Sequence, residues 1–197
     1  MTLTNGAVSV SKEIYFCAWK NNVMMRLVSL FVLTLIFSIP AKAQTETVIY
    51  TFGTTPTDGY EPSAPLLIDA SGNLFGTTSG GGTAVLCPDP SGLNSCGIVF
   101  ELVKSSGNYT ERVLHNFSGP LGDGDEPMAG LIMDSSGNLF GTTGFGGSGL
   151  CGATSCGTAF ELVKSPSGYT ENVLHMFTGF DGGFIFADLV IDSSGNL

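Results

Sequence analysis

The chain has 197 residues, of which 7 are basic, 17 acidic and 28 glycine, and only 12% of all residues are charged. Globular chains carry about 25% charged residues and about 7% glycine, so this chain is poor in charge and rich in glycine. This composition excludes a long coiled coil, and the 43% of hydrophobic residues argue against disorder. The shortage of basic residues argues against nucleic acid as a partner.

The N-terminal segment has the features of an export signal. Residues 27–39 form an apolar run of 13 that follows Arg26 and precedes Pro-Ala-Lys-Ala at 40–43. A basic start, a short apolar run and an A-x-A ending are typical of a secretory signal peptide. We therefore expect cleavage after Ala43, no membrane span in the mature chain, and a secreted or cell-surface location. An uncleaved membrane anchor is the alternative, although 13 residues are few for crossing a bilayer.

Residues 1–23 make this leader longer than the 15–30 residues that are usual for a signal peptide. Met24 and Met25 immediately precede Arg26. We therefore interpret residues 1–23 as an over-extended start and residues 24–43 as the signal peptide. Residues 44–197 then keep three basic residues against 16 acidic ones. A surface this acidic repels polyanions and attracts cations.

From residue 44 onward the dominant feature is an internal repeat. Three segments recur in the same order, namely TETVIYTF (45–52, then 110–117 and 170–177), DASGNLFGTT (69–78, then 134–143 and in part 192–197) and GIVFELVK (97–104, then 157–164). Matches of this length at a regular spacing indicate a tandem-repeat architecture.

Each repeat is expected to contain four short strands. In the second copy we place them at residues 131–133, 138–143, 158–164 and 169–177. Strand alternation puts Phe160 and Leu162 on one face of the third strand. Glycine-containing turns connect the strands. A meander of four strands every 58–65 residues fits the blade of a β-propeller.

We therefore predict an all-β fold, an incomplete β-propeller with about two full four-stranded blades and a partial blade at each end. The expected segments of 44–197 are a lone strand at 45–52, repeat one at about 62–117, repeat two at about 127–177 and a truncated repeat three at about 184–197. Because propellers need about four or more blades to close, we expect the chain to be a fragment of a longer propeller.

A family resemblance rests on these repeated residues. The string G-L-x-x-D-x-S-G-N-L-F-G-T-T, followed by a glycine-rich loop and G-x-x-F-E-L, resembles the GloVer (Gloeo/Verruco) tandem repeat of exported bacterial proteins. Its core from Pro127 to Phe140 is also similar to blades of NHL and SMP-30-like propellers. The resemblance covers nearly all of 45–197 and implies a propeller in an extracellular setting. It supplies no activity from which catalytic residues could be assigned. The third copy departs from the pattern, because DGGFI at 181–185 replaces the D-G-x-E-P of 58–62 and 123–127.

The cysteines lie at equivalent places in two successive repeats, between the second and third predicted strands. An even number of cysteines in an exported chain indicates disulfides, and we expect the local pairs Cys87–Cys96 and Cys151–Cys156. A Cys₄ zinc site joining two blades is the alternative. Its spacings, C-x₈-C and C-x₄-C, do not match the usual short zinc-binding pairs in both arms.

Acidic residues supply two further kinds of candidate. Asp69, Asp134 and Asp192 begin the predicted hairpin turns, where we expect their carboxylates to accept hydrogen bonds from turn N–H groups. Clustered oxygen donors in two loops are the candidate calcium ligands, namely Asp58, Glu61, Asp123, Asp125 and Glu126. A solvated turn between blades is the other interpretation of these loops. No other cofactor is expected.

Other motifs receive structural interpretations. His115 and His175 occupy the repeat position that Tyr50 holds in the first copy, so we assign this position to strand packing. The G-x-G-x-x-G string at 144–149 is followed by another strand instead of a helix, so it predicts no dinucleotide site. No Ser or Cys nucleophile has a discernible His and Asp arrangement around it.

These observations favour an exported, non-enzymatic repeat protein that serves as a binding or structural module at the cell surface. Its partner would be a protein or a glycan. Repetition without a unique polar constellation is what an interaction scaffold shows. The alternative is part of a propeller hydrolase or lyase whose site lies in the central channel and whose residues are mostly missing from this chain.

Overall fold

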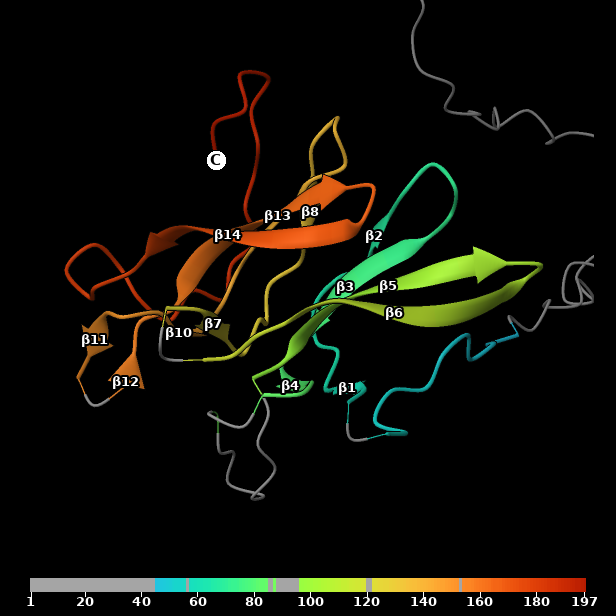
Figure 1. Ribbon diagram of the computed structural model, residues 1–197, viewed down its shortest axis with the longest axis horizontal. Helices are drawn as coiled ribbons and strands as arrows, with labels where there is room; N and C mark the ends of the chain where they lie inside the picture. The colour runs from blue at the N-terminus through green and yellow to red at the C-terminus, as the bar shows by residue number, and fades with distance from the viewer. Residues whose placement is uncertain (1–44, 56, 85–86, 88–95, 120–121, 153) are drawn as a thin grey trace, which may run out of the picture. The chain divides into compact units, whose positions relative to one another are not determined.

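The computed structural model describes residues 45–55, 57–84, 87, 96–119, 122–152 and 154–197, and this part of the chain is all-β (Figure 1). The predicted signal peptide and residues 1–23 lie outside the described residues. From residue 47 onward the chain forms one compact unit. Within the described ranges, no helix is long and apolar enough to cross a bilayer.

Two four-stranded antiparallel sheets form the framework, and in each the strands are paired in chain order (Figure 1). The first contains β2 (Leu67–Ile68), β3 (Leu74–Thr78), β5 (Ile98–Ser105) and β6 (Asn108–Asn116). The second contains β8 (Ile132–Met133), β9 (Leu139–Thr142), β13 (Thr158–Ser165) and β14 (Gly168–Met176). The four strands predicted for the second copy are therefore confirmed, with small differences at their ends.

Three two-stranded sheets complete the described strands. They pair β1 (Gly59–Tyr60) with β4 (Gly80–Gly81), β7 (Gly124–Asp125) with β10 (Phe145–Gly146), and β11 (Leu150–Cys151) with β12 (Thr154–Ser155). The first two pairs are equivalent, and each connects the acidic loop of one copy to the chain just after the second strand of its four-stranded sheet, β3 or β9. None of the sheets closes on itself among the described residues.

The main hydrophobic core lies between the two four-stranded sheets. Its buried members come from both of them: Phe75, Cys87, Cys96, Val99, Phe117, Leu131, Leu139, Phe160 and Leu162. The rings of Phe117 and Phe160 meet edge to face at 5.1 Å between centroids. Phe160 and Leu162 are fully buried on one face of β13, as strand alternation predicts.

The opposite face of the first sheet is covered by the segment at 45–52. Tyr50 and Phe52 pack against Ile98, Phe100 and Leu102, and the rings of Phe52 and Phe100 are 4.7 Å apart. This segment is not paired as a strand of any sheet, and the predicted lone strand at 45–52 stays a prediction. Pairing as a strand needs a hydrogen-bonded neighbour, and the apolar residues 27–39 stand before residue 45 where later copies have G-x-x-F-E-L-V-K.

The contacts between successive copies repeat with the sequence. The hydroxyl of Thr77 donates to the carbonyl oxygen of Ala129, and that of Thr142 donates to Ala187, both at 3.1 Å. Three residues at equivalent positions have a left-handed backbone with φ of 51–58°, namely Glu61, Glu126 and Phe184. The third copy therefore continues the backbone of the repeat where its sequence departs from D-G-x-E-P, although residues 184–197 form no strand.

Gly141 on β9 provides a test of the packing within one sheet. A Cβ at this position would lie 2.7 Å from Cζ of Phe160 and 3.0 Å from Cδ2 of Leu131, both of which are buried. We expect Gly141→Ala to lower the free energy of unfolding by about 1–3 kcal/mol in urea titrations. The control Ser136→Ala, in the exposed turn before β9, should change it by less than about 0.5 kcal/mol. Equal stability of the two variants would contradict this packing.

Candidate functional site

The three turn aspartates make one set of hydrogen bonds three times. Oδ1 of Asp69 accepts from the backbone N–H groups of Ser71 at 2.8 Å and Asn73 at 2.9 Å, and Oδ2 accepts from the Asn73 amide at 2.9 Å. Asp134 and Asp192 repeat this pattern at 2.8–2.9 Å. Burial would raise the pKa of Asp69, but these hydrogen bonds outweigh it and lower the pKa. Asp69, Asp134 and Asp192 therefore stabilise the turns that they begin.

The first pair of calcium candidates is not assembled into one site. Asp58 is buried, and its Oδ2 accepts hydrogen bonds from the backbone and hydroxyl of Thr54, both at 3.1 Å. Glu61 accepts a hydrogen bond from the Ser79 hydroxyl at 3.2 Å. Among the described residues, neither Asp58 nor Glu61 belongs to a group of three close ligand atoms.

The second set of calcium candidates is Asp123, Asp125 and Glu126, and each of the three has different neighbours. Oδ2 of Asp123 accepts hydrogen bonds from the backbone and hydroxyl of Ser118, at 2.6 and 2.8 Å. Asp125 lies beside a disulfide, and Glu126 uses its backbone N–H to bond the carbonyl of Cys96 at 3.1 Å. The structure therefore does not gather Asp123, Asp125 and Glu126 around one cation.

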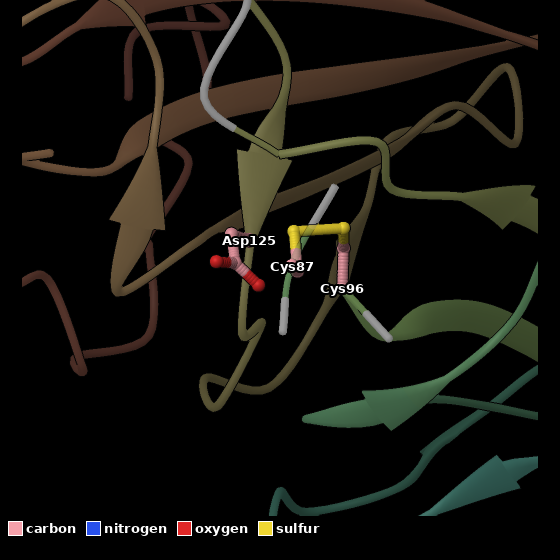
Figure 2. A group of neighbouring side chains, drawn as sticks. All are labelled: Cys87, Cys96 and Asp125. Atoms are coloured by element: carbon pink, nitrogen blue, oxygen red, sulfur yellow. A yellow bond between two sulfur atoms is a disulfide. The ribbon is translucent and has the colours of Figure 1, made fainter. Parts of the chain in front are cut away.

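The cysteines are paired as the sequence predicts, Cys87 with Cys96 and Cys151 with Cys156. Figure 2 shows the carboxyl group of Asp125 next to the first pair. Because the two sulfur atoms are bonded to each other, this group of three offers no thiolate to a metal. Burial, together with the charges of Glu126 and Asp123, raises the pKa of Asp125 to about 7.

A different polar group lies where the two four-stranded sheets meet. His115 on β6, Asp123 in the loop before β7 and Glu171 on β14 form what we term the second junction cluster. Nε2 of His115 is 3.5 Å from Oδ1 of Asp123 and 3.6 Å from Oε2 of Glu171. The three side chains are 14–19% exposed. The cluster thus joins two successive copies through largely buried, ionisable groups.

Burial and neighbouring charge act differently on the two carboxyl groups of this cluster. Burial would raise the pKa of Asp123, but His115 and the hydrogen bonds from Ser118 and Gly124 lower it overall. Burial raises the pKa of Glu171 to about 7, with a further contribution from Asp123 and an opposing one from His115. The pair therefore combines a readily ionised carboxylate with a carboxyl group that ionises near neutral pH.

The first copy holds an equivalent group, the first junction cluster of Tyr50, Asp58 and Glu111. The Tyr50 hydroxyl lies 3.2 Å from Oε2 of Glu111 and 3.5 Å from Oδ1 of Asp58, and it donates toward these carboxylates. Burial and the two carboxylates raise the pKa of Tyr50 to about 12. Burial and Asp58 raise the pKa of Glu111 to about 7. Here the hydroxyl occupies the place that the imidazole takes in the second copy.

In the third copy, Nε2 of His175 lies 2.9 Å from Oδ2 of Asp181. Both side chains are well exposed, at 50% and 41%. Hydrogen bonds from the backbone and hydroxyl of Thr178 lower the pKa of Asp181 to about 2. Within the described residues, no glutamate of a following copy joins this pair.

Sequence reasoning did not single out Glu111 or Glu171. His115 does pack at the edge of Phe117, with ring centroids 4.7 Å apart, but it also faces two carboxylates. The available signal is the repeated T-E-x-V-[IL]-[YH]-x-F string, which keeps a glutamate four residues before the Tyr or His. That signal is incomplete, because each cluster takes its glutamate from the copy after the one that supplies the Tyr or His.

The raised pKa of Glu111 predicts a pH-dependent stability. A carboxyl group whose pKa rises on folding favours the native state when protonated, so its contribution is lost as the pH increases from about 4.5 to about 7. We expect Glu111→Gln to be more stable than the native sequence at pH 8, by about 1 kcal/mol after allowance for solvent screening.

The measurement is thermal or urea unfolding at pH 4 and pH 8, and the difference should disappear at pH 4. Glu46, the exposed residue at the equivalent position of the first copy, provides the matched control Glu46→Gln, which should have no effect at either pH. A Glu111→Gln variant that is less stable than the native chain at pH 8 would contradict the cluster as described.

Comparison with known proteins identifies the repeat. The sequence matches the family described as the Gloeobacter/Verrucomicrobia repeat over residues 33–197, a range that includes both four-stranded sheets and all three copies of the junction position. Comparisons with curated proteins and with solved structures gave no match. The match confirms the resemblance to the GloVer repeat, whereas the likeness to NHL and SMP-30-like blades stays a prediction. The chain belongs to the Gloeobacter/Verrucomicrobia repeat family.

Proposed function

We propose that this chain is an exported, non-enzymatic module that acts at the cell surface as a binding or structural segment of a β-propeller. One observation carries the proposal. The buried polar groups occur at equivalent positions, as Tyr50 with Asp58 and Glu111 and again as His115 with Asp123 and Glu171. Polar groups repeated at both of these junctions serve to join copies, whereas a catalytic site is a single, asymmetric arrangement.

The propeller is supported by the regular relation between copies. Each four-stranded sheet is a meander of adjacent antiparallel strands, which is the connectivity of a propeller blade. The same hydroxyl-to-carbonyl bond links Thr77 to Ala129 and Thr142 to Ala187. A contact that recurs between successive blades sets a constant rotation from each repeat to the next.

Export is supported by the leader sequence and by the two disulfides. Disulfides form and persist in oxidising compartments, which include the bacterial periplasm and the cell surface. The two pairs join cysteines that are 9 and 5 residues apart in the sequence.

A binding role is supported by an open hollow next to the second disulfide. Exposed apolar side chains line it, including Leu150, Phe180 and Phe184, together with Thr178 and several glycines. Phe180 is fully exposed and Leu150 is 74% exposed. Aromatic and apolar groups surrounded by polar backbone suit contacts with another protein or with the faces of sugar rings.

The alternative, a hydrolase or lyase with its site in a central channel, finds less support. The first strands of the two sheets are the ones that would line such a channel, and they carry only Leu67, Ile68, Ile132 and Met133. These side chains offer no acid, base or nucleophile. Turnover of a glycoside, ester or polyuronate by the purified chain would favour this alternative.

The proposed export is tested by expressing the full chain in a bacterial host that has a periplasm. We expect the secreted or periplasmic species to begin at Gln44, and non-reducing peptide mapping to return Cys87 linked to Cys96 and Cys151 linked to Cys156. Intact-mass measurement before and after reduction provides the control for disulfide number. A cytoplasmic product that keeps its leader, or four free thiols, would contradict the proposal.

The proposed binding role is tested by labelling the exported chain and measuring its retention on bacterial cells. We expect Phe180→Ser to reduce retention several-fold, because the exposed ring is part of the hollow. The control Val190→Ser changes an exposed apolar residue that does not line the hollow. Protease or periodate treatment of the cells distinguishes a protein partner from a glycan. No retention of the native chain would count against a surface-binding role.

A further inference from the structure

The second junction cluster contains buried polar atoms that the described protein groups do not satisfy. Nε2 of His115 and Oε1 of Glu171 are each buried from solvent and have no hydrogen-bond partner among the described residues. Leaving such atoms unpaired is unfavourable, because each has lost its hydrogen bonds to water. The arrangement therefore calls for a ligand between these side chains.

The distances in the cluster indicate what kind of ligand fits. The separations of 3.5 and 3.6 Å from Nε2 of His115 to the two carboxylate oxygens exceed those of good hydrogen bonds. A tetrahedral Zn²⁺ with bonds of roughly 2.0–2.1 Å places its ligand atoms roughly 3.3–3.4 Å apart. One ligand atom from each of His115, Asp123 and Glu171 lies within 4.8 Å of the others. A small shift of the side chains would bring all three to one metal ion.

The charges in this region also favour a cation. Residues 44–197 contain three basic side chains, and none of them neutralises the cluster. Arg112 forms an ion pair with Glu101. The side chains of Lys104 and Lys164 lie against Gly72 and Gly137 in the hairpin turns. The two carboxylates of the junction are therefore left with His115 as their one basic neighbour among the described residues.

In the first junction cluster a protein hydroxyl occupies the place of Nε2 of His115, and Oε1 of Glu111 is the atom left without a hydrogen-bond partner among the described residues. There the Tyr50 hydroxyl lies between the two carboxylates and donates a hydrogen bond. Tyr50 also packs on Phe52 at 4.8 Å, as His115 packs on Phe117 at 4.7 Å. Exchange of Tyr for the shorter His removes the hydroxyl and introduces a nitrogen with a lone pair. The second copy thus places an imidazole nitrogen where the first places a hydroxyl donor.

We propose that the second junction cluster binds a divalent transition-metal cation of the Zn²⁺ type through Nε2 of His115 and the carboxylates of Asp123 and Glu171. A neutral imidazole nitrogen is a good ligand for Zn²⁺, whereas Ca²⁺ takes oxygen ligands, so the cluster selects against calcium. The bound ion connects β6 and the following loop to β14. It therefore clamps one repeat to the next, a structural role that does not depend on export or on a surface partner.

The test uses the full chain, expressed with its leader, purified, and freed of metal with a chelator. Equilibrium dialysis against Zn²⁺ should give about one tightly bound ion per chain, and Zn²⁺ should raise the melting temperature by several degrees. Ca²⁺ at the same concentration should leave the melting temperature unchanged. Absence of zinc binding, or an equal effect of calcium, would overturn the proposal and leave the cluster as an ion pair only.

A matched pair of variants locates the ion. His115→Tyr recreates the first junction and should weaken Zn²⁺ binding at least a hundredfold without lowering the melting temperature of the metal-free chain. His175→Tyr alters the exposed histidine that also faces a carboxylate, and it should leave zinc binding unchanged. Zinc binding that survives His115→Tyr, or that is lost in His175→Tyr, would place the ion elsewhere and overturn the proposal.

A second variant keeps the test valid if His115→Tyr fails to fold. Glu171→Gln preserves the shape of the side chain and removes one anionic ligand. It should reduce zinc affinity at least tenfold while the metal-free chain melts at or above the native temperature. Unchanged zinc affinity in Glu171→Gln would overturn the assignment of this ligand set.

Discussion

The burial of one face of each sheet against the next copy is the constraint on which the rest of this structure depends. Phe117, just after β6, packs on Phe160 of β13, and the first disulfide lies in the same core. The first strand of each sheet, β2 or β8, has only two residues. One such sheet cannot bury enough apolar surface alone. The carboxyl groups at the junction are desolvated because this packing brings the copies together, and that desolvation raises the pKa of Glu111 and of Glu171.

The junction clusters show how a repeat can change its chemistry without changing its fold. Tyr50 and His115 occupy the same position and make the same edge contact with a phenylalanine. The tyrosine brings a donor to one oxygen of each neighbouring carboxylate, whereas the histidine leaves Nε2 buried without a hydrogen-bond partner among the described residues. Both arrangements hold two copies together. Function in such an array therefore depends on the residues at individual junctions, and the fold alone does not specify it.

Some predictions from sequence succeeded because they involve neighbours along the chain. The strands of the second copy, the buried face of β13 and the two cysteine pairs all follow from local alternation and spacing. Residues 45–52 are not paired as a strand, and the sequence before them lacks the G-x-x-F-E-L-V-K segment that pairs with their counterparts. The grouping of acidic residues as calcium ligands stays a prediction, and successive carboxylates in one loop face different surroundings among the described residues.

The sequence by itself determined the repeat, the four strands of the second copy and the turns, since the bonds of a turn aspartate reach only two to four residues along the chain. Tertiary structure alone decided which polar groups meet. Tyr50 reaches Glu111 across 61 residues, and His115 meets Glu171 from the following copy. Desolvation and electrostatic interaction depend on distance in space, and packing between copies sets that distance, so no local pattern could reveal the junction clusters.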